Sequence, residues 1–409
     1  MTTKNNFWIA VSIIMLGAIA ALIYWMSNDK GSNMTIEDKR AKCLSQPAKD
    51  IPSKMPQRKS YDENFSHLFY NFPSWWMPQL GSIQSISMPD ANTIYEKILV
   101  NGENVWFTYS PDSSIARYDT QTNKLKLYSI PDKRNQPFKV LDIYLTHNET
   151  LWATLNSPQP GGGYSILARY RPDKDEFEII TDQDGMFAHL QETWGNPSDK
   201  KIAEMLDGQL AVVMEGNIYL YNPATNRAQL LLDSGNIESI AAGKGNRIWY
   251  VNHYKDFNIR AVDAETRKIV DYGIPPNLGK QFEAQPELLE ATKAISIDQQ
   301  GRVWVSYFDR LEPDKNGQYS WHSVKLPSVF VNTFDPYYAY RWADVFSTHV
   351  FSDGNVWFVS DIGIVKYDVQ NEIWCLSAEV KTFVNYPITE DANGNIWTVI
   401  DNQIYKLQN

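Results

Sequence analysis

The chain has 409 residues, a formal net charge of −10 and 13% aromatic residues, including 14 tryptophans. The negative charge, and a sequence without a basic cluster, exclude a general nucleic-acid binder, which needs cations to neutralise phosphates. Length alone allows two or three domains, but a repeat that spans residues 104–398 favours one large domain after an N-terminal extension.

Residues 7–26 form an apolar run without a single charge. Twenty residues in a helix rise about 30 Å, which matches the hydrocarbon core of a bilayer. Aromatic residues stand at both ends of the run, where the membrane interface favours them. We expect residues 1–6 to be a short tail and residues 7–26 an uncleaved, single-pass transmembrane anchor. A cleaved signal peptide is the alternative, because Ala18-Ile19-Ala20 matches a small-residue cleavage site.

The side of the membrane is ambiguous in the sequence. Only Lys4 precedes the apolar run, whereas Lys30, Lys39, Arg40 and Lys42 follow it, and the positive-inside tendency would place the following domain in the cytoplasm. A lone N-terminal span before one large domain is, however, the usual form of a secretory anchor. We therefore expect the domain to be extracytoplasmic.

Residues 27–80 are polar and proline-rich, which is typical of a stalk. The aromatic end of this stalk, Phe65–Trp76, is expected to pack on the folded domain. The two cysteines are Cys43 in the stalk and Cys375 near the C-terminus. In an oxidising compartment they could pair, and two unrelated thiols are the alternative.

A turn followed by an aromatic and β-branched run recurs seven times, at intervals of about 40 to 60 residues. The runs are Asn104–Phe107, Thr150–Ala153, Asp207–Val212, Arg247–Tyr250, Arg302–Val305, Val356–Val359 and Asn395–Thr398. Each run carries a tryptophan except the third, where Ala211 takes its place. A four-stranded blade needs about 40 to 50 residues. The repeat predicts an all-β fold, a seven-bladed β-propeller of four-stranded blades over residues 81–409.

The seventh copy ends at Asn409, directly after its third strand. A spare strand, residues 82–88, precedes the first copy. We expect it to supply the missing outer strand and close the ring, because this would leave no open sheet edge at the seam.

The repeats resemble those of two related propeller families. Val105–Thr108 followed by Ile115–Asp119 resembles the repeat of virginiamycin B (streptogramin) lyases. Asp353–Asp368 and Asn393–Trp397 resemble the sensor propellers of two-component regulators. The resemblance covers residues 90–409 in the repeat pattern only, so it implies the fold and no activity. Tyr109 also stands where the lyase repeats often carry glutamate.

Long segments fall where connections between second and third strands, and between blades, would open on one face. They are Asn156–Tyr164, Thr181–Lys200, Asn252–Phe257, Gly273–Thr292, Phe308–Gln318 and Leu326–Ala343. Because binding concentrates in loops on a rigid scaffold, this loop-rich face is the predicted binding face. Its aromatic and arginine residues are the types enriched at interface hot spots. The predicted contact residues are Trp194, Tyr254, Tyr307, Arg310, Tyr337, Tyr338, Tyr340, Arg341 and Trp342.

The sequence contains no recognisable nucleophile motif, zinc pattern or phosphate loop. We expect a membrane-tethered, non-catalytic ligand-binding, sensor or protein-interaction propeller, without a cofactor. The partner would be a protein, a peptide or a small molecule. The alternative is a carbon–oxygen lyase for cyclic depsipeptides or lactones, with His253 or His189 and a Mg²⁺ or Ca²⁺ ion. Carboxylates that could hold the ion are Glu96, Asp142 and Glu238, on the expected innermost strands.

Overall fold

The chain divides into two compact units, Met1–Ile51 and Pro52–Asn409. The computed structural model describes residues of the second unit only. They are residues 84–87, 97–109, 114–131, 138–156, 165–181, 183, 185, 201–252, 258–276, 295–305, 309–324, 345–360, 363–378, 387–400 and 403–407. Within these ranges, no helix is long and apolar enough to cross a membrane. The predicted anchor at 7–26, the stalk at 27–80 and Cys43 lie outside them, as does the side chain of Cys375.

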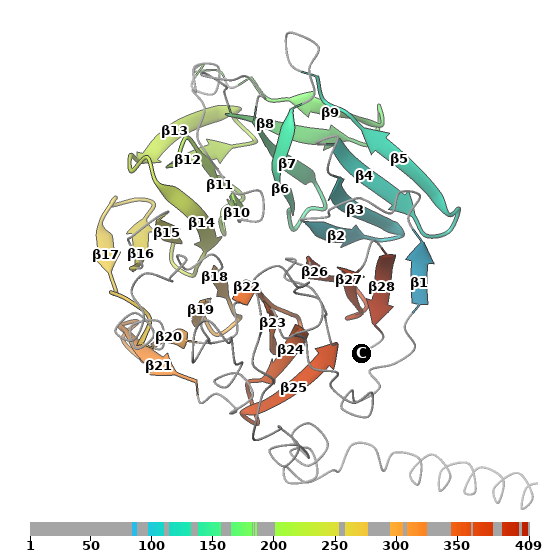
Figure 1. Cartoon of the computed structure of the whole chain (residues 1–409). Helices are drawn as coiled ribbons and strands as arrows, with labels where there is room; N and C mark the ends of the chain where they lie inside the picture. The colour runs from blue at the N-terminus through green and yellow to red at the C-terminus, as the bar shows by residue number, and fades with distance from the viewer. Residues whose placement is uncertain are drawn as a thin grey trace, which may run out of the picture. The chain divides into compact units, whose positions relative to one another are not determined.

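The described strands form seven four-stranded antiparallel sheets, arranged as a ring (Figure 1). This confirms the seven-bladed propeller, and we number the blades one to seven from the first repeat. Blade one contains β2 (Ile98–Asn101), β3 (Asn104–Tyr109), β4 (Ser114–Asp119) and β5 (Lys124–Tyr128). Blade two contains β6 (Lys139–Leu145), β7 (Leu151–Asn156), β8 (Ser165–Arg171) and β9 (Glu176–Ile179). Blade three contains β10 (Ile202–Glu204), β11 (Leu210–Met214), β12 (Asn217–Asn222) and β13 (Arg227–Leu232).

The remaining blades follow the same order from the innermost to the outermost strand. Blade four contains β14 (Ile237–Ala242), β15 (Arg247–Asn252), β16 (Ile259–Asp263) and β17 (Ile269–Asp271). Blade five contains β18 (Ile295–Ile297), β19 (Val303–Val305), β20 (Asp309–Pro313) and β21 (Tyr319–Ser323). Blade six contains β22 (Val345–Val350), β23 (Val356–Ser360), β24 (Gly363–Asp368) and β25 (Ile373–Ala378). Blade seven contains β26 (Ile388–Glu390), β27 (Ile396–Ile400), β28 (Gln403–Leu407) and β1 (Gln84–Ser87).

Blade seven joins the two ends of the described chain. The strand expected at 82–88 is β1, which pairs with β28 from Gln84 opposite Lys406 to Ser87 opposite Gln403. In Figure 1 the blue β1 therefore lies beside the red β28. The innermost strand of blade one, β2, contacts both β6 and β26. The first and last blades are thus neighbours, and the ring is closed.

Turns at one end of the ring are short and satisfy their own backbone groups. In the turn that leads to the outermost strand of blade one, Asp119 Oδ1 accepts hydrogen bonds from the amides of Gln121 and Thr122, both at 2.9 Å. Asn222 does the same for Ala224 and Thr225 in blade three, at 2.9 and 3.1 Å. Asp and Asn favour such turns because a short side chain can bond amides two or three residues ahead. We call this end the short-turn end, opposite the loop-rich face.

The hydrophobic core lies in the joints between neighbouring blades. Alternate residues of each strand face the preceding or the following blade, because successive side chains point to opposite faces of a sheet. Large buried side chains of the second strands fill these joints, among them Trp249, Trp304 and Trp357, each at most 1% exposed. The tryptophan repeat in the sequence is therefore a packing repeat.

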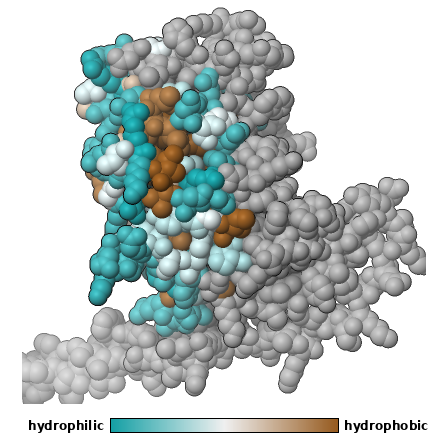
Figure 2. Space-filling view, turned by 90° about the vertical axis from the view of Figure 1, so that its left-hand side faces the viewer, coloured by the Kyte–Doolittle hydropathy of each residue, from teal (hydrophilic) through white to brown (hydrophobic). Residues whose placement is uncertain are grey.

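The outer side of the ring mixes polar and apolar residues. Figure 2 views the side that carries β17 in Figure 1, and it shows an apolar strip bordered by hydrophilic residues. Exposed hydrophobic side chains of this blade include Ile269, at 46% exposure, and Ile274, at 39%. Scattered exposed apolar residues are common on protein surfaces, and these two side chains indicate no function by themselves.

Candidate binding site

Most of the predicted contact residues lie outside the described part of the chain. This applies to both candidate histidines, His189 and His253, and to every predicted contact on the loop-rich face except Arg310. Their roles remain predictions. The residues that the structure does describe can be placed, and they define the scaffold under the loop-rich face.

Arg310 lies in a strand, and the prediction of a long loop over Phe308–Gln318 was wrong. Residues 309–313 form β20, the third strand of blade five, and Arg310 pairs with Trp304 across to β19. Arg310 is 5% exposed, and its Nε donates a 2.6 Å hydrogen bond to Glu312. Charged residues and Pro313 hid this strand in the sequence. A side chain this buried offers little surface to a partner.

The position of Arg310 belongs to a repeat of its own. In five blades a cation on the third strand pairs with the anchor tryptophan and lies 5.0 to 5.8 Å from the ring centroid. The pairs are Arg117–Trp106, Arg169–Trp152, Arg310–Trp304, Lys366–Trp357 and Lys406–Trp397. A cation over an indole face is attracted by the ring quadrupole. Alignment of the third strands would have identified Arg310 as structural.

The two described metal candidates are built into the innermost strands. Asp142 is 3% exposed, and its Oδ2 accepts hydrogen bonds from the amides of Lys201, at 2.6 Å, and Ile202, at 3.2 Å. The other oxygen, Oδ1, lies 3.5 Å from Lys97 Nζ. Glu238 is 4% exposed, and Lys201 Nζ donates to its carbonyl oxygen. These contacts cross three joints in succession, from blade one to blade four.

Lys201 is the functional-site candidate that the sequence analysis missed. It lies ten residues before Ala211, and Asp142 lies ten residues before Trp152. The offset that selected Asp142 also gives Lys201 when it is counted from Ala211, so the sequence contained this signal. Among the described residues, no group of three or more His, Cys, Asp or Glu side chains could hold a metal ion. Glu96 lies outside them, so the divalent-ion site remains a prediction.

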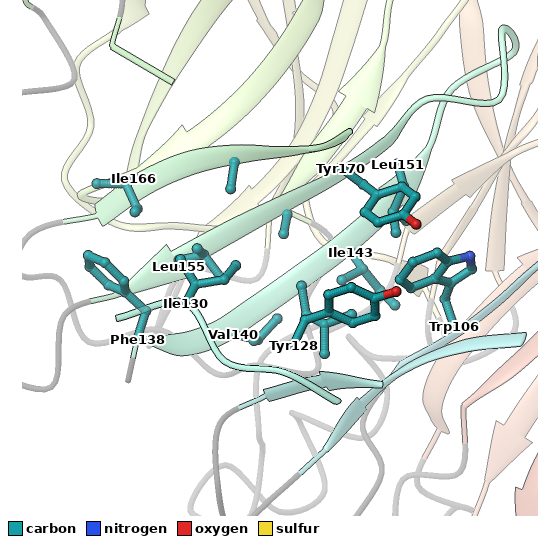
Figure 3. Close-up of a cluster of buried hydrophobic side chains, with 13 residues drawn as sticks. Trp106, Tyr128, Ile130, Phe138, Val140, Ile143, Leu151, Leu155, Ile166 and Tyr170 are labelled. Carbon is teal, nitrogen blue, oxygen red and sulfur yellow. The ribbon is translucent and has the colours of Figure 1, made fainter. Parts of the chain in front are cut away.

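Two neighbouring joints differ in chemistry, and we call them the first joint (blades one and two) and the second joint (blades two and three). Apolar side chains fill the body of the first joint (Figure 3). Phe138, Val140 and Leu155 fill one part of it, and an aromatic cluster fills the other. In that cluster the ring centroid of Trp106 lies 4.7 Å from that of Tyr170, 5.5 Å from that of Tyr128 and 6.2 Å from that of Phe177.

Asp175 ties the short-turn end of the first joint together. The hydroxyls of Tyr128 and Tyr170 donate to its Oδ1 at 2.6 Å, Arg117 donates at 3.0 Å, and Lys126 pairs with Oδ2. Partial burial disfavours the charge, but the hydrogen bonds from Lys126, Tyr128 and Tyr170 outweigh it and hold the pKa of Asp175 below its ordinary value. The charged carboxylate of Asp175, in blade two, thus binds side chains of blade one and holds the two blades together.

In the second joint, no carboxylate stands at the turn position that corresponds to Asp175. Asn226 takes the corresponding turn position and accepts a 2.9 Å hydrogen bond from Tyr221. Arg169, the equivalent of Arg117, turns back to Glu178 of its own blade at 2.8 Å. At the short-turn end, one aromatic contact, Trp152 to Tyr221 at 5.8 Å, takes the place of the larger cluster.

Toward the loop-rich face the second joint becomes polar. Thr154 lies opposite Asp142, whose carboxylate reaches across to blade three, so Thr154 faces the same joint. Ser165, two residues before Leu167, faces it as well. Thr154 and Ser165 are 0% and 1% exposed, and within the described structure their hydroxyl oxygens have no hydrogen-bond partner. Each unpaired buried group costs about 1–3 kcal/mol.

Blade three contributes a rigid, acidic corner at the same end, which we define as Glu215, Asn217, Tyr219 and Asp233. Its second and third strands are joined by Glu215-Gly216 alone. Gly216 has a φ of +67°, and a Cβ there would lie 2.4 Å from Gly235. Asn217 Oδ1 accepts hydrogen bonds from the amides of Ser234, at 2.8 Å, and Gly235, at 2.7 Å. These contacts therefore hold the Glu215-Gly216 turn against the segment that connects blade three to blade four.

The acidic corner concentrates negative charge around one hydroxyl. Burial raises the pKa of Tyr219, and the nearby charges of Glu215 and Asp233 raise it further, so both carboxylates lie close to this residue. Burial also raises the pKa of Glu215, whose Oε1 is buried and accepts no hydrogen bond from any described residue. Neither carboxylate forms an ion pair within the described ranges. The two carboxylates of the corner are thus acceptors without a cationic partner among the described residues.

Comparisons with known proteins identify the fold and no family. No family model matches the chain, and no curated protein matches it. Among solved structures, the chain is similar to an extracellular domain assigned to a hybrid two component system of B. thetaiotaomicron, with a TM-score of 0.57 and 15% identity. That match covers 80% of this chain and 43% of the other, so this chain spans less than half of that domain.

Alignments with two further solved structures cover nearly the whole of the other chain. YCF48 bound to D1 peptide aligns with a TM-score of 0.55 and 10% identity, over 81% of this chain and 99% of the other. The WD40 repeats of RRP9 align with a TM-score of 0.54 and 8% identity, over 80% and 97%. At these identities the similarity shows a common β-propeller fold, in agreement with the resemblance of the repeats, and leaves the activity open.

Proposed function

We propose that this protein is a membrane-tethered, non-catalytic β-propeller that binds a protein or peptide partner at its loop-rich face, as a sensor or interaction module. The observation that carries the proposal is a set of buried side-chain groups toward the loop-rich face that have no hydrogen-bond partner among the described residues. At the short-turn end, turn side chains bond their own backbone. Toward the loop-rich face, buried hydroxyls of Thr154 and Ser165 and the carboxylate of Glu215 have no hydrogen-bond partner among the described residues. Buried unsatisfied groups are rare in folded proteins and gather at functional sites.

The fold provides precedents for this kind of function. The similar structures include an extracellular domain of a two component system and a propeller bound to a peptide. A propeller is a rigid scaffold, and connections at one end of it can vary without loss of the blades. The anchor proposed for residues 7–26 would hold the domain at the membrane, on the extracytoplasmic side.

Photocrosslinking from both ends of the ring tests the binding face. A photoreactive residue is placed at Ser328 or Asn277, in the long connections, or at Thr225 or Lys315, in exposed turns of the short-turn end. The full chain is irradiated in its native membrane. We expect discrete crosslinked products from the first pair of positions and none from the second. Equal products from both pairs, or none from either, would refute the proposed binding face.

Two controls test the remaining parts of the proposal. With Cys43 and Cys375 replaced by serine, a single cysteine at Ser328 should react with a membrane-impermeant thiol reagent before lysis, once any outer membrane is permeable. Carbonate extraction should leave the full chain in the membrane. The lyase alternative predicts Mg²⁺-dependent turnover of a cyclic depsipeptide or lactone that His253→Ala or His189→Ala abolishes, and such turnover would overturn the non-catalytic assignment.

A further inference from the structure

The loop-rich end of the second joint presents hydrogen-bond acceptors that no described residue satisfies. Glu215 lies four residues after Ala211, just as Asn156 lies four residues after Trp152. Ser165 pairs with Asn156 across β7 and β8. Counted from these anchors, Glu215 of blade three and Ser165 of blade two therefore lie at the same level of the ring.

We infer that Glu215, Asp233 and Tyr219 receive a single basic side chain, a guanidinium or an ammonium, from the peptide or protein partner. This inference rests on the proposed function and adds the chemistry of the contact. A basic group supplies the donor that Glu215 Oε1 does not have. It also neutralises two carboxylates that form no ion pair within the described chain. A hydrogen bond between ionised partners is shorter and roughly twice as strong as a neutral one.

The surroundings favour a cation with several donors over a metal ion. The hydroxyls of Thr154 and Ser165, buried in the second joint, are further acceptors without a partner among the described residues, on the blade-two side of the same end. The described residues offer no third His, Cys, Asp or Glu ligand for a metal ion at this corner. A guanidinium carries five N–H donors and can serve several acceptors together.

The acidic corner is also preorganised. The Glu215-Gly216 turn is fixed by the close approach of Gly216 to Gly235 and by a 2.9 Å hydrogen bond from the amide of Ile237 to the carbonyl of Gly216. The turn needs little reordering when a ligand arrives, and a site that is rigid in advance loses less entropy on binding. The formal net charge of −10 further attracts a basic partner.

Ligand-detected saturation-transfer NMR on the detergent-solubilised full chain tests the inference. The probes are acetyl-Gly-Gly-Arg-Gly-Gly-amide and the same peptide with citrulline, the neutral counterpart of arginine. We expect saturable binding of the arginine peptide, with the strongest signals from the methylene next to the guanidinium, and roughly tenfold weaker binding of the citrulline peptide. Binding should strengthen as pH rises through the ionisation of Glu215.

Variants separate the acidic corner from general charge. Glu215→Gln and Asp233→Asn should each weaken binding of the arginine peptide roughly tenfold or more, while the melting temperature confirms the fold. Glu149→Gln, an exposed carboxylate at the short-turn end with the same charge change, should have no effect. Equal binding of both peptides, equal loss in Glu149→Gln, competition by Ca²⁺ or Mg²⁺ alone, or no binding would each overturn the inference. Crosslinking confined to the loop-rich face, together with any of these results, would leave the proposed function standing and remove only the basic contact.

Discussion

The first and second joints share blade two, yet different kinds of interaction hold them together. Apolar side chains fill the body of the first joint, and Asp175 holds its short-turn end together by accepting hydrogen bonds from Arg117, Tyr128 and Tyr170. The second joint has one tryptophan–tyrosine contact at that end and leaves Thr154 and Ser165 without hydrogen-bond partners among the described residues at the other. We expect the first joint to be the more stable of the two, and the second joint to be less stable at the end where we propose that a partner binds.

The largest expected effect is the loss of an anchor tryptophan. Trp106→Ala should destabilise the protein by about 3–5 kcal/mol, because Trp106 is 4% exposed and packs against three aromatic rings. Trp152→Ala should cost less stability, since among the described residues one ring contact of Trp152, with Tyr221, takes the place of the three made by Trp106. Thermal unfolding of the two variants measures the difference. Equal losses would mean that the two joints contribute equally to stability.

Removal of the charge that fastens the first joint comes next. Asp175→Asn should cost about 1–2 kcal/mol at pH 7, an amount kept low because the side chain is 41% exposed and solvent screens its ion pairs. The folded-state pKa of Asp175 lies below its unfolded value, so this stability is present above about pH 4 and is lost as pH falls further. The difference in unfolding free energy between wild type and variant should therefore narrow below pH 4. A difference independent of pH would show that the charge is not involved.

A third change tests the unpaired hydroxyls of the second joint. Thr154→Val replaces a hydroxyl that has no described partner and should leave stability unchanged or raise it by about 1 kcal/mol. The matched control is Thr398→Val in blade seven, where the hydroxyl donates a 3.0 Å hydrogen bond to the carbonyl of Pro387. That variant should lose about 1 kcal/mol. Chemical denaturation distinguishes the two, and equal losses would indicate that Thr154 is hydrogen-bonded in solution.

The smallest effect concerns Glu215, and its pH dependence has the opposite sign to that of Asp175. The pKa of Glu215 is raised by burial, so folding favours the neutral acid, and the stability it contributes at low pH is lost as pH rises through the folded-state pKa. Glu215→Gln mimics the neutral form. It should be more stable than wild type at pH 7, by less than about 1 kcal/mol, and equal to it near pH 4. Melting temperatures across this range provide the measurement, and a variant less stable at pH 7 would contradict the assignment.

Much of the scaffold could be predicted from local sequence, because each blade is encoded by short-range signals. Turn residues, alternating strands and the anchor residues from Trp106 to Trp397 mark seven blades without reference to any distant contact. The prediction failed at Phe308–Gln318, where charged residues and Pro313 mask the strand β20. The site was harder to predict, since the structural role of Arg310 emerges only when its strand is aligned with the third strands of the other blades.

The sequence by itself determined the number of blades, the order of their strands and the position of each anchor, because these depend on periodicity within about 50 residues. Only the tertiary structure decided which residues meet across the joints. Asp175 faces Arg117, and Asp142 meets the amide of Lys201, because separate sheets pack at a particular register. No spacing within one blade fixes that register. The contrast between a fastened joint and a polar joint therefore appears only when the blades stand side by side.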